Sequence, residues 1–201
     1  MERAGDVRAI KAVVRGSDPE RFNREVAALE RVDHDRIVHI QDHGVLTARD
    51  GRQFPFITSE FIPGGDVDHM LSDHGPPADD ELRAFIDGCL EGLETVHAAS
   101  IVHRDFKPAN VMLRDGRWDQ PVIIDLGLIR LLDASTHTLY PWAGGTWPWM
   151  APEQLRGERA TDRSDMWALA VVAAQVAANQ HPFWRGELSP RRTGTAASSR
   201  A

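Results

Sequence analysis

The chain of 201 residues has few cysteines, no long apolar run and no excess of basic residues, and each of these absences excludes a class of protein. Cys89 is the single cysteine, so an intramolecular disulfide and a metal site made of cysteines are both excluded. No window approaches the roughly 18 uninterrupted apolar residues of a membrane-spanning helix, and the N-terminus lacks the apolar core of a signal peptide. The formal net charge of −7 disfavours a nucleic-acid-binding surface. We therefore expect a cytoplasmic protein with no membrane segment and no nucleic-acid partner.

What is present is the composition of an ordinary globular protein, with 42% apolar and 26% charged residues. In the first third of the chain, β-branched residues around Lys11 predict a strand over residues 7–14. Apolar residues at helical spacing predict a helix over about 18–29. Two more strands are expected over 37–46 and 54–61.

The remainder of the chain is mainly helical in pattern. Apolar residues recur at three- and four-residue steps over residues 80–99, and residues 164–178 are apolar nearly all round, which predicts a buried central helix. Two short strands are expected between these helices, at 111–113 and 122–124. A Pro-Gly-Gly sequence at 63–65 is the best candidate for a hinge between two lobes. Residues 185–201 are poor in apolar residues, which predicts a disordered tail.

The most informative segment is His-Arg-Asp-Phe-Lys-Pro-Ala-Asn at residues 103–110. It places a carboxylate that can act as a base, a cation and a metal ligand close together, at Asp105, Lys107 and Asn110. Phosphoryl transfer needs an Asp beside the attacking hydroxyl, and an Asn five residues later can hold a metal ion on the phosphates. The alternative is a polar surface loop with an accidental tripeptide, and eight residues in register make that alternative improbable.

Six further segments occur in the order and spacing of one known family. They are Ala9-Ile10-Lys11, Glu25, Ser59-Glu60-Phe61-Ile62, Asp125-Leu126-Gly127, residues 145–153 and residues 162–167. Over about residues 7–184 the chain resembles the eukaryotic-type (Hanks-type) serine/threonine protein kinase family, in its bacterial form. The resemblance implies an α+β fold with two lobes. An incomplete, β-rich small lobe would cover residues 1–62, and a mainly helical large lobe would cover 63–184 and end after the central helix.

The resemblance also implies ATP and Mg²⁺ as cofactors and assigns roles to particular residues. Asp105, Lys107 and Thr146 would be catalytic, with Asp105 as the base. The residues that would bind the cofactors are Lys11, Glu25, Glu60, Ile62, Asn110 and Asp125. Of these, Asn110 and Asp125 would hold Mg²⁺, because both present the hard oxygen donors that this ion prefers. Glu25 would form an ion pair with Lys11, which would neutralise the α and β phosphates.

The pattern of Lys107 with Thr146 resembles family members that phosphorylate serine or threonine, so a protein substrate with such an acceptor is implied. Arg104 beside Asp105 marks members that are switched by phosphorylation of the activation segment. Candidate autophosphorylation sites are Ser135, Thr136 and Thr138. The alternative for each is an exposed loop that contains hydroxyl side chains by composition.

Three structural roles also follow from the resemblance. His103 would pack in the core and bind backbone rather than take part in the reaction. Leu29, Ile40 and Leu126 would join His103 in an apolar column between the lobes. Asp165 would anchor the backbone of the 103–110 loop from the start of the central helix.

The chain departs from the family pattern at both ends. Residues 1–10 contain a single glycine, so a glycine-rich loop ahead of Lys11 is absent. Arg191 and Arg192 are poor substitutes for the arginine that pairs with the equivalent of Glu153. We therefore expect a chain truncated at both ends. An active kinase is favoured, and the alternatives are a catalytically impaired kinase fragment that serves as a pseudokinase-like binding module and a small-molecule phosphotransferase of similar fold.

Overall fold

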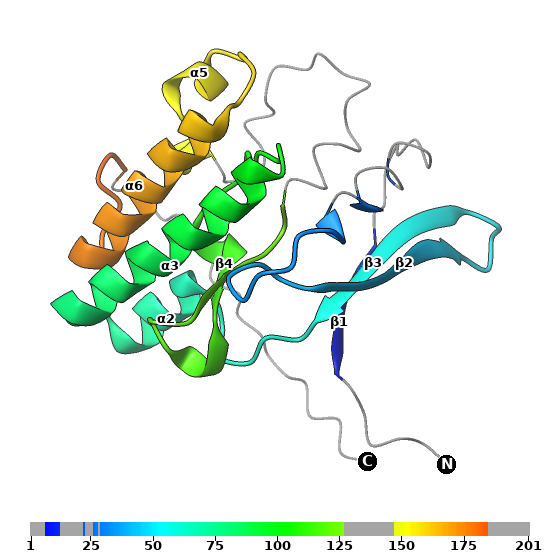
Figure 1. Ribbon diagram of the computed structural model, residues 1–201, viewed down its shortest axis with the longest axis horizontal. Coiled ribbons are helices and arrows are strands. Elements are labelled where there is room, and N and C mark those ends of the chain that lie inside the picture. Colours follow the sequence, from blue (N-terminus) through cyan, green and yellow to red (C-terminus); the bar gives the residue numbers. More distant parts are fainter. Residues whose placement is uncertain (1–6, 13–21, 23–25, 28, 127–146, 185–201) are drawn as a thin grey trace, which may run out of the picture.

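The computed structural model shows a small sheet beside a larger group of helices (Figure 1). The structure describes residues 7–12, 22, 26–27, 29–126 and 147–184. The sheet has three antiparallel strands in the order β1-β3-β2. These strands are β1 (Arg8–Ala12), β2 (Ile40–Thr47) and β3 (Gln53–Glu60). Because β3 lies in the middle, Lys11 of β1 is paired with Ile57 of β3.

The helix predicted ahead of β2 is only partly described. Phe22, Val26 and Leu29 have helical backbone and are buried, as their spacing predicts. The other positions between 18 and 28, apart from Ala27, lie outside the described residues. The described positions place the apolar side of this segment against the core of the small lobe.

The segment ahead of β2 connects the two lobes and corrects one prediction. Ile37 was expected to belong to the strand over 37–46, but it forms an isolated parallel bridge with Ile123 instead. The Val38 N–H donates to the Ile123 carbonyl over 3.0 Å, and the Ile123 N–H donates to the Arg36 carbonyl over 2.8 Å. A buried backbone segment must satisfy its hydrogen bonds, and here the large lobe supplies the partners.

The large lobe is built around α3 (Asp79–Ala98) and α6 (Asp162–Ala178), which lie side by side (Figure 1). The shorter helices are α2 (Val67–His74) and α5 (Pro152–Leu155). An antiparallel pair of strands, β4 (Val111–Leu113) and β5 (Pro121–Ile123), lies close to the predicted positions. In the described ranges, no helix combines the length and the apolar character needed to cross a bilayer.

α3 is the element that the apolar pattern predicted best. Phe85, Cys89, Leu93 and Val96 all lie on one face and are fully buried. The N-terminus of the helix is held by Glu81, whose carboxylate accepts a hydrogen bond from the Ala78 N–H over 3.0 Å. The helix therefore presents a continuous apolar face to the core of the large lobe.

α2 is a helix that the sequence patterns did not indicate. Asp66 caps it, because its carboxylate accepts a hydrogen bond from the His69 N–H over 2.8 Å. Val67, Met70 and Leu71 are its buried residues. With only eight residues, the helix is too short for its periodicity to stand out from a loop.

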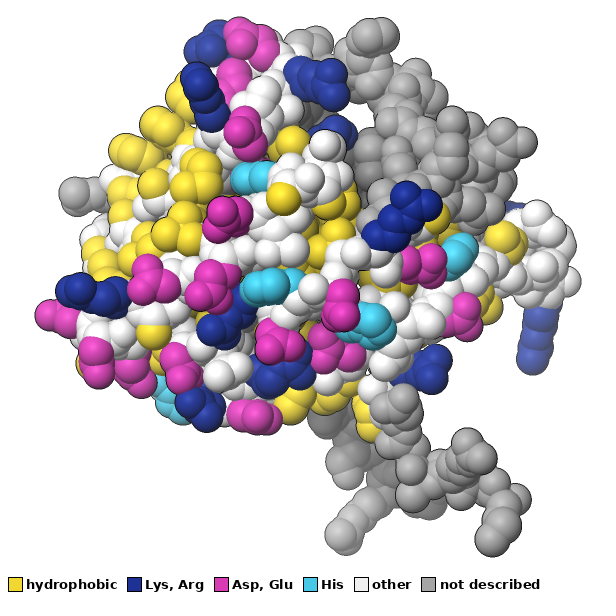
Figure 2. Space-filling view, in the orientation of Figure 1, with side chains coloured by type: hydrophobic (Ala, Val, Ile, Leu, Met, Phe, Trp, Pro, Cys, Tyr) yellow, Lys and Arg dark blue, Asp and Glu magenta, His cyan; other side chains and the backbone are white. Residues whose placement is uncertain are grey.

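α6 is not buried on all sides, contrary to the prediction. Leu169 and Val172 are buried, but Met166 and Trp167 are 42% and 40% exposed. Figure 2 shows hydrophobic side chains gathered on the left of the molecule, where α6 lies in Figure 1. The Trp167 ring stacks on the exposed Phe183 ring at a centroid distance of 6.1 Å. The prediction was wrong because composition shows what a helix can bury, while its neighbours decide which side is covered.

One hydrophobic core continues from the sheet into the helices. Ile57 of β3, Phe85 of α3 and Val172 of α6 belong to the same cluster of buried residues. Leu29, Ile40 and Leu126, which were predicted to form a column between the lobes, belong to it as well. The two lobes are therefore joined by packing as well as by the chain.

The Pro-Gly-Gly connection between β3 and α2 is bound to the β4–β5 hairpin. The Pro63 carbonyl accepts a hydrogen bond from the Asp115 N–H over 2.8 Å, and the Gly65 carbonyl accepts one from the Leu113 N–H over 2.9 Å. Gly64 has a φ of +117°, and a Cβ atom there would lie 2.1 Å from the Leu113 carbonyl oxygen. The boundary at residues 62/63 stays a prediction, and residues 185–201 lie outside the described residues.

We expect Gly64→Ala to lower the free energy of unfolding by about 2–5 kcal/mol. Roughly 1–2 kcal/mol comes from the positive φ and roughly 1–3 kcal/mol from the overlap with backbone. Gly51→Ala is the matched control, because Gly51 has a φ of +81° but nothing within 4 Å of its Cβ position. Urea unfolding of the two variants measures the difference. Equal destabilisation of the two variants would show that the overlap between the added methyl group and the hairpin backbone contributes nothing.

Candidate active site

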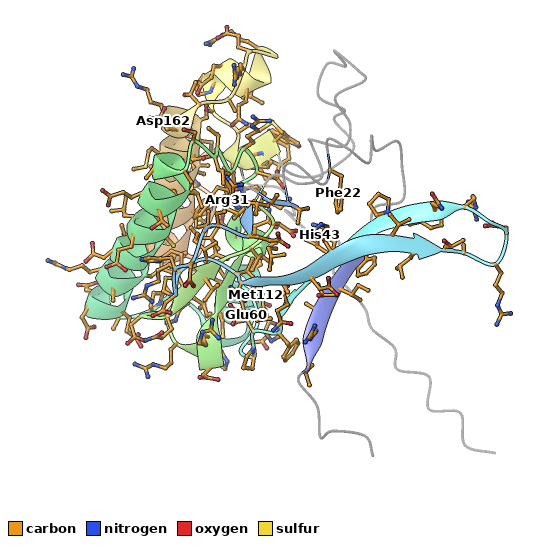
Figure 3. The ribbon with its side chains drawn as sticks, turned by 45° about the vertical axis from the view of Figure 1, so that its right-hand side comes forward. Phe22, Arg31, His43, Glu60, Met112 and Asp162 are labelled. Atoms are coloured by element: carbon orange, nitrogen blue, oxygen red, sulfur yellow. The ribbon has the colours of Figure 1, made fainter. Side chains whose placement is uncertain are left out.

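A cavity of about 330 Å³ lies where the sheet meets the large lobe. This volume is in the range of small-molecule sites, which is roughly 300–1,000 Å³. Figure 3 shows Glu60 of β3 and Met112 of β4 next to each other at this junction, and both line the cavity. Apolar side chains from both lobes make up much of the wall, among them Val38, Ile57 and Leu126. The cavity can therefore hold a small, largely apolar group between the lobes.

Lys11 and Asp125 provide the charged part of the cavity wall. The Lys11 Nζ lies 2.6 Å from the Asp125 Oδ2, and both side chains are about one-third exposed, at 33% and 31%. An ion pair with this much solvent contact contributes at most about 1 kcal/mol, so an incoming ligand can separate it. Glu25, the predicted partner of Lys11, lies outside the described residues.

The predicted catalytic residues Asp105 and Lys107 and the predicted metal ligand Asn110 meet as one cluster. The Lys107 Nζ donates to the Asp105 Oδ2 over 3.0 Å. The Asn110 Nδ2 donates to the same oxygen over 3.1 Å and to the Asp105 carbonyl over 2.7 Å. A short 3₁₀ helix, Pro108–Asn110, turns the chain so that the asparagine faces back toward the aspartate.

The same loop is connected to the cavity through the backbone. The Ile124 N–H donates to the Asn110 carbonyl over 2.9 Å, and Asp125 follows immediately in the chain. Asp125 has a φ of +61°, an unusual conformation for an aspartate that turns the chain sharply after β5. The backbone of Asn110 is therefore tied to the residue that precedes Asp125.

Asp165 anchors the loop from α6, as predicted. Its Oδ2 accepts a hydrogen bond from the His103 N–H, and its Oδ1 accepts one from the Arg104 N–H, each over 2.8 Å. Arg104 has a φ of +67°, which costs a non-glycine residue free energy unless neighbouring groups hold it. Gln154 adds a third bond, because its Nε2 donates to the Arg104 carbonyl over 3.0 Å.

His103 is fully buried and serves the structure, as predicted. Its Nε2 donates to the Ile124 carbonyl over 2.9 Å, and its Nδ1 accepts from the Asp105 N–H over 3.3 Å. Both bonds together require the neutral ring, since a protonated imidazole has no acceptor nitrogen. Burial lowers the pKa of His103, which outweighs the opposing effect of the Asp165 carboxylate.

Glu60 and Ile62 were predicted to bind the nucleotide, and both line the cavity. The Glu60 carboxylate is engaged elsewhere, because it accepts from the Arg114 Nη2 over 2.9 Å and from the His39 N–H over 3.1 Å. This ion pair ties the end of β3 to the β4–β5 hairpin of the large lobe. Ile62 is buried at 4% exposure.

Several predicted residues lie outside the described residues, and others were missed. Those outside are Glu25, Thr146, Ser135, Thr136, Thr138, Arg191 and Arg192. Glu153 accepts a hydrogen bond from the Ser164 Oγ over 2.6 Å, which lowers the pKa of Glu153.

The sequence reasoning missed His97 and Gln154. The available signal for His97 was a histidine at the end of an apolar helix, six positions before His103.

Comparison with known proteins identifies the family. The model of the protein kinase domain matches residues 2–197 of the chain. The chain belongs to the protein kinase family, which confirms the resemblance drawn from residues 103–110. Members of this family in general use ATP and Mg²⁺ and act on proteins.

Similar proteins include bacterial serine/threonine kinases. A probable serine/threonine-protein kinase of Thermomonospora curvata, PkwA, is 35% identical over 177 residues, which is 87% of this chain and 23% of PkwA. The serine/threonine-protein kinase PknL of Mycobacterium tuberculosis is 34% identical over 164 residues, which is 81% of this chain and 39% of PknL. The chain thus spans between about a quarter and two-fifths of the length of these relatives.

A solved structure confirms the predicted fold class. The crystal structure of Rad53 1-466 in complex with AMP-PNP matches with a TM-score of 0.69 and 24% sequence identity. The match covers 89% of this chain and 43% of that chain. The two-lobed α+β architecture is therefore that of protein kinases.

The burial of His103 predicts how stability depends on pH. Its pKa in the folded protein lies below the ordinary value of 6.5, so below that pH the unfolded chain binds more protons. The contribution of His103 to stability is therefore present above pH 6.5 and falls by about 1.4 kcal/mol per pH unit below it. Urea unfolding measured from pH 8 to 5 gives the free energy of unfolding as a function of pH. Below pH 6.5, the slope of this free energy against pH should be shallower by this amount in His103→Gln.

Asp68 has the opposite effect, because burial raises its pKa to about 6. This contribution is common to both proteins and cancels in the difference between their slopes. Identical slopes for the unchanged chain and His103→Gln would contradict a buried neutral His103.

Proposed function

We propose that this chain transfers the γ-phosphoryl group of ATP to a serine or threonine of a protein substrate. The observation that carries the proposal is the cluster of Asp105, Lys107 and Asn110, joined through Ile124 to the charged end of the cavity. One loop thus supplies a base, a cation and an oxygen ligand for a metal, and Asp125 supplies a second oxygen ligand at the cavity wall. Relatives named as serine/threonine-protein kinases support the choice of acceptor.

The cavity fits ATP by the chemistry of its wall. The adenine would lie among the apolar side chains, next to the backbone of Glu60 and Ile62. Lys11 would leave Asp125 and bind the phosphates, with Glu25 as the partner that keeps its ammonium group in place. The weak, partly exposed ion pair between Lys11 and Asp125 supports this exchange.

Asp125 and Asn110 are the residues that would hold Mg²⁺. In the part of the chain that the structure describes, no group of three or more His, Cys, Asp or Glu side chains could hold an ion. Mg²⁺ commonly takes only one or two carboxylates and completes its shell with phosphate oxygens and water. When bound, the ion would neutralise negative charge on the phosphates.

The chemical step requires little from the protein beyond positioning and charge. Lys107 and Asn110 both bind Oδ2 of Asp105, so Oδ1 is the oxygen we assign to the substrate hydroxyl. As the bond from the hydroxyl oxygen to the γ-phosphorus forms and the bond to ADP breaks, the hydroxyl proton passes to Asp105. Lys107 would stabilise the charge on the transferring group, and Thr146 would complete the contact between Asp105 and Lys107.

Asp105→Asn tests the proposal with labelled ATP, Mg²⁺ and a generic protein substrate. We expect the rate of transfer to fall by about 10²–10⁴, because the amide cannot accept the proton. Asp119→Asn is the control, since the Asp119 side chain pairs with Arg117 at the surface and not with residues 103–110. Equal rates for the unchanged chain and Asp105→Asn would overturn the proposed role. No transfer by the unchanged chain would overturn the activity.

Lys11→Met and Asp125→Asn separate the binding of phosphate from the binding of metal. We expect Mg²⁺ to strengthen ATP binding by roughly tenfold or more in the unchanged chain. Asp125→Asn should lose that increment, while Lys11→Met should weaken binding both with and without Mg²⁺. Calorimetric titration with ATP, with Mg²⁺ or with a chelator, measures both effects. A full Mg²⁺ increment in Asp125→Asn would contradict its role as metal ligand.

A further inference from the structure

The carboxylate of Glu60 joins three segments at one end of the cavity. Glu60 is the last residue of β3 and lines the cavity. Its Oε1 accepts a hydrogen bond from the His39 N–H over 3.1 Å, and its Oε2 accepts one from the Arg114 Nη2 over 2.9 Å. The backbone adds to the first contact, because the Glu60 N–H donates to the His39 carbonyl over 3.1 Å. Glu60 is therefore held within the small lobe, and Arg114 ties its side chain to the large lobe.

The contact with Arg114 is the second of two attachments between this segment and the β4–β5 hairpin. Arg114 follows β4 directly, and its N–H donates to the Gln120 carbonyl over 3.0 Å inside the hairpin. The next amide, that of Asp115, donates to the Pro63 carbonyl over 2.8 Å. A single hydrogen bond leaves the connection free to rotate about it. A second attachment three positions earlier in the chain, at Glu60, opposes that rotation.

Rotation at this connection changes the width of the cavity, because the two lobes supply different parts of its wall. Ile57 comes from the sheet, and Met112 comes from β4 of the large lobe. Figure 3 shows Glu60 beside Met112, and Arg114 lies only two positions after Met112. A ligand enclosed between these walls leaves more easily when they move apart. The ion pair of Glu60 and Arg114 spans both walls and opposes the movement.

We propose that Arg114 is a positioning residue that slows the release of a bound nucleotide, because it holds Glu60 and so keeps the sheet close to the large lobe. The proposal rests on the proposed function, since it takes the cavity as the nucleotide site. The side chains of Arg114 and Glu60 are 34% and 23% exposed. An ion pair with this exposure is strong enough to bias the opening and weak enough to break at each release.

Arg114→Met and Arg114→Lys are a matched pair of variants. Methionine keeps much of the aliphatic length but has neither charge nor N–H donor, whereas lysine keeps both. The observed contact uses a single donor, Nη2, so lysine can restore it. Arg117→Met is the control, because Arg117 belongs to the same hairpin but pairs with Asp119 of that hairpin and not with the small lobe.

The first measurement is the rate at which a fluorescent ADP analogue, methylanthraniloyl-ADP, leaves the chain when an excess of ATP is added. We expect release to be about two- to fivefold faster in Arg114→Met, the range that a partly exposed ion pair can supply. Arg114→Lys and Arg117→Met should release the analogue at nearly the rate of the unchanged chain. Equal rates in all four proteins would overturn the proposal, and so would equally fast release from Arg117→Met and Arg114→Met.

The second measurement uses the chain without nucleotide. Amide hydrogen exchange at Asp115 reports the opening of the bond to Pro63, which links the hairpin to the connection. Exchange at Gln120, whose N–H donates to the Arg117 carbonyl over 3.1 Å, reports unfolding of the hairpin itself. We expect exchange at Asp115 to be about two- to fivefold faster in Arg114→Met and restored in Arg114→Lys, with Gln120 unchanged. Faster exchange at both amides would show unfolding of the hairpin and overturn the proposal.

Phosphoryl transfer to a protein substrate, measured in parallel, separates this proposal from the proposed function. Equal release and exchange in all variants of a chain that transfers phosphate would overturn the role of Arg114 alone. Faster release from Arg114→Met, in a chain that transfers nothing, would support the role of Arg114 and reject the reaction. A chain that binds no ADP analogue would overturn the role of Arg114 together with the nucleotide site.

Discussion

The buried carboxylate of Asp165 is the interaction on which the rest of the site depends. With 1% of its side chain exposed, its charge is tolerable only because protein donors surround it. These donors come from the end of α3 and from two successive backbone positions of the catalytic loop. Satisfying one charge therefore brings a helix, a loop and the start of α6 into a single arrangement. The left-handed backbone at Arg104 is held within this arrangement, and the placement of Asp105 follows from it.

The charged groups of the site differ in burial, and the difference matches the role proposed for each. Asp165 is buried, so loss of its hydrogen bonds would leave a buried charge without partners. These hydrogen bonds are therefore part of the stable fold. Lys11 and Asp125 are each about one-third exposed, and their ion pair is weak enough to open. Asp105 and Lys107 are intermediate, at 24% and 20% exposure, which suits the proposal that they stay ordered and contact a substrate. The contacts between the two lobes also differ in burial. The hydrophobic core that joins the lobes is buried, while the ion pair of Glu60 and Arg114 lies near the surface.

Much of the fold could be predicted where a pattern extends over several turns or strand residues. The apolar repeat in α3 and the β-branched run in β1 led to elements in nearly the right places, because a long periodic face can be buried in only one way. The predictions failed where neighbours decide the outcome. Ile37 pairs with β5 instead of the sheet, α2 is too short to show a period, and Met166 and Trp167 stay exposed on an apolar helix. In each case the structure of the segment depends on which element packs against it.

The sequence by itself determined the local chemistry of the site. Asp105, Lys107 and Asn110 lie within six positions, so one short turn is enough to bring their side chains together, and no distant segment is needed. Only the tertiary structure decided which groups hold that turn in place. The chain contains nine histidines, and nothing in their spacing shows that His97 would reach a carboxylate 68 positions away. A buried charge accepts any donor that packing delivers to it, so the choice among distant donors belongs to the fold and not to the motif.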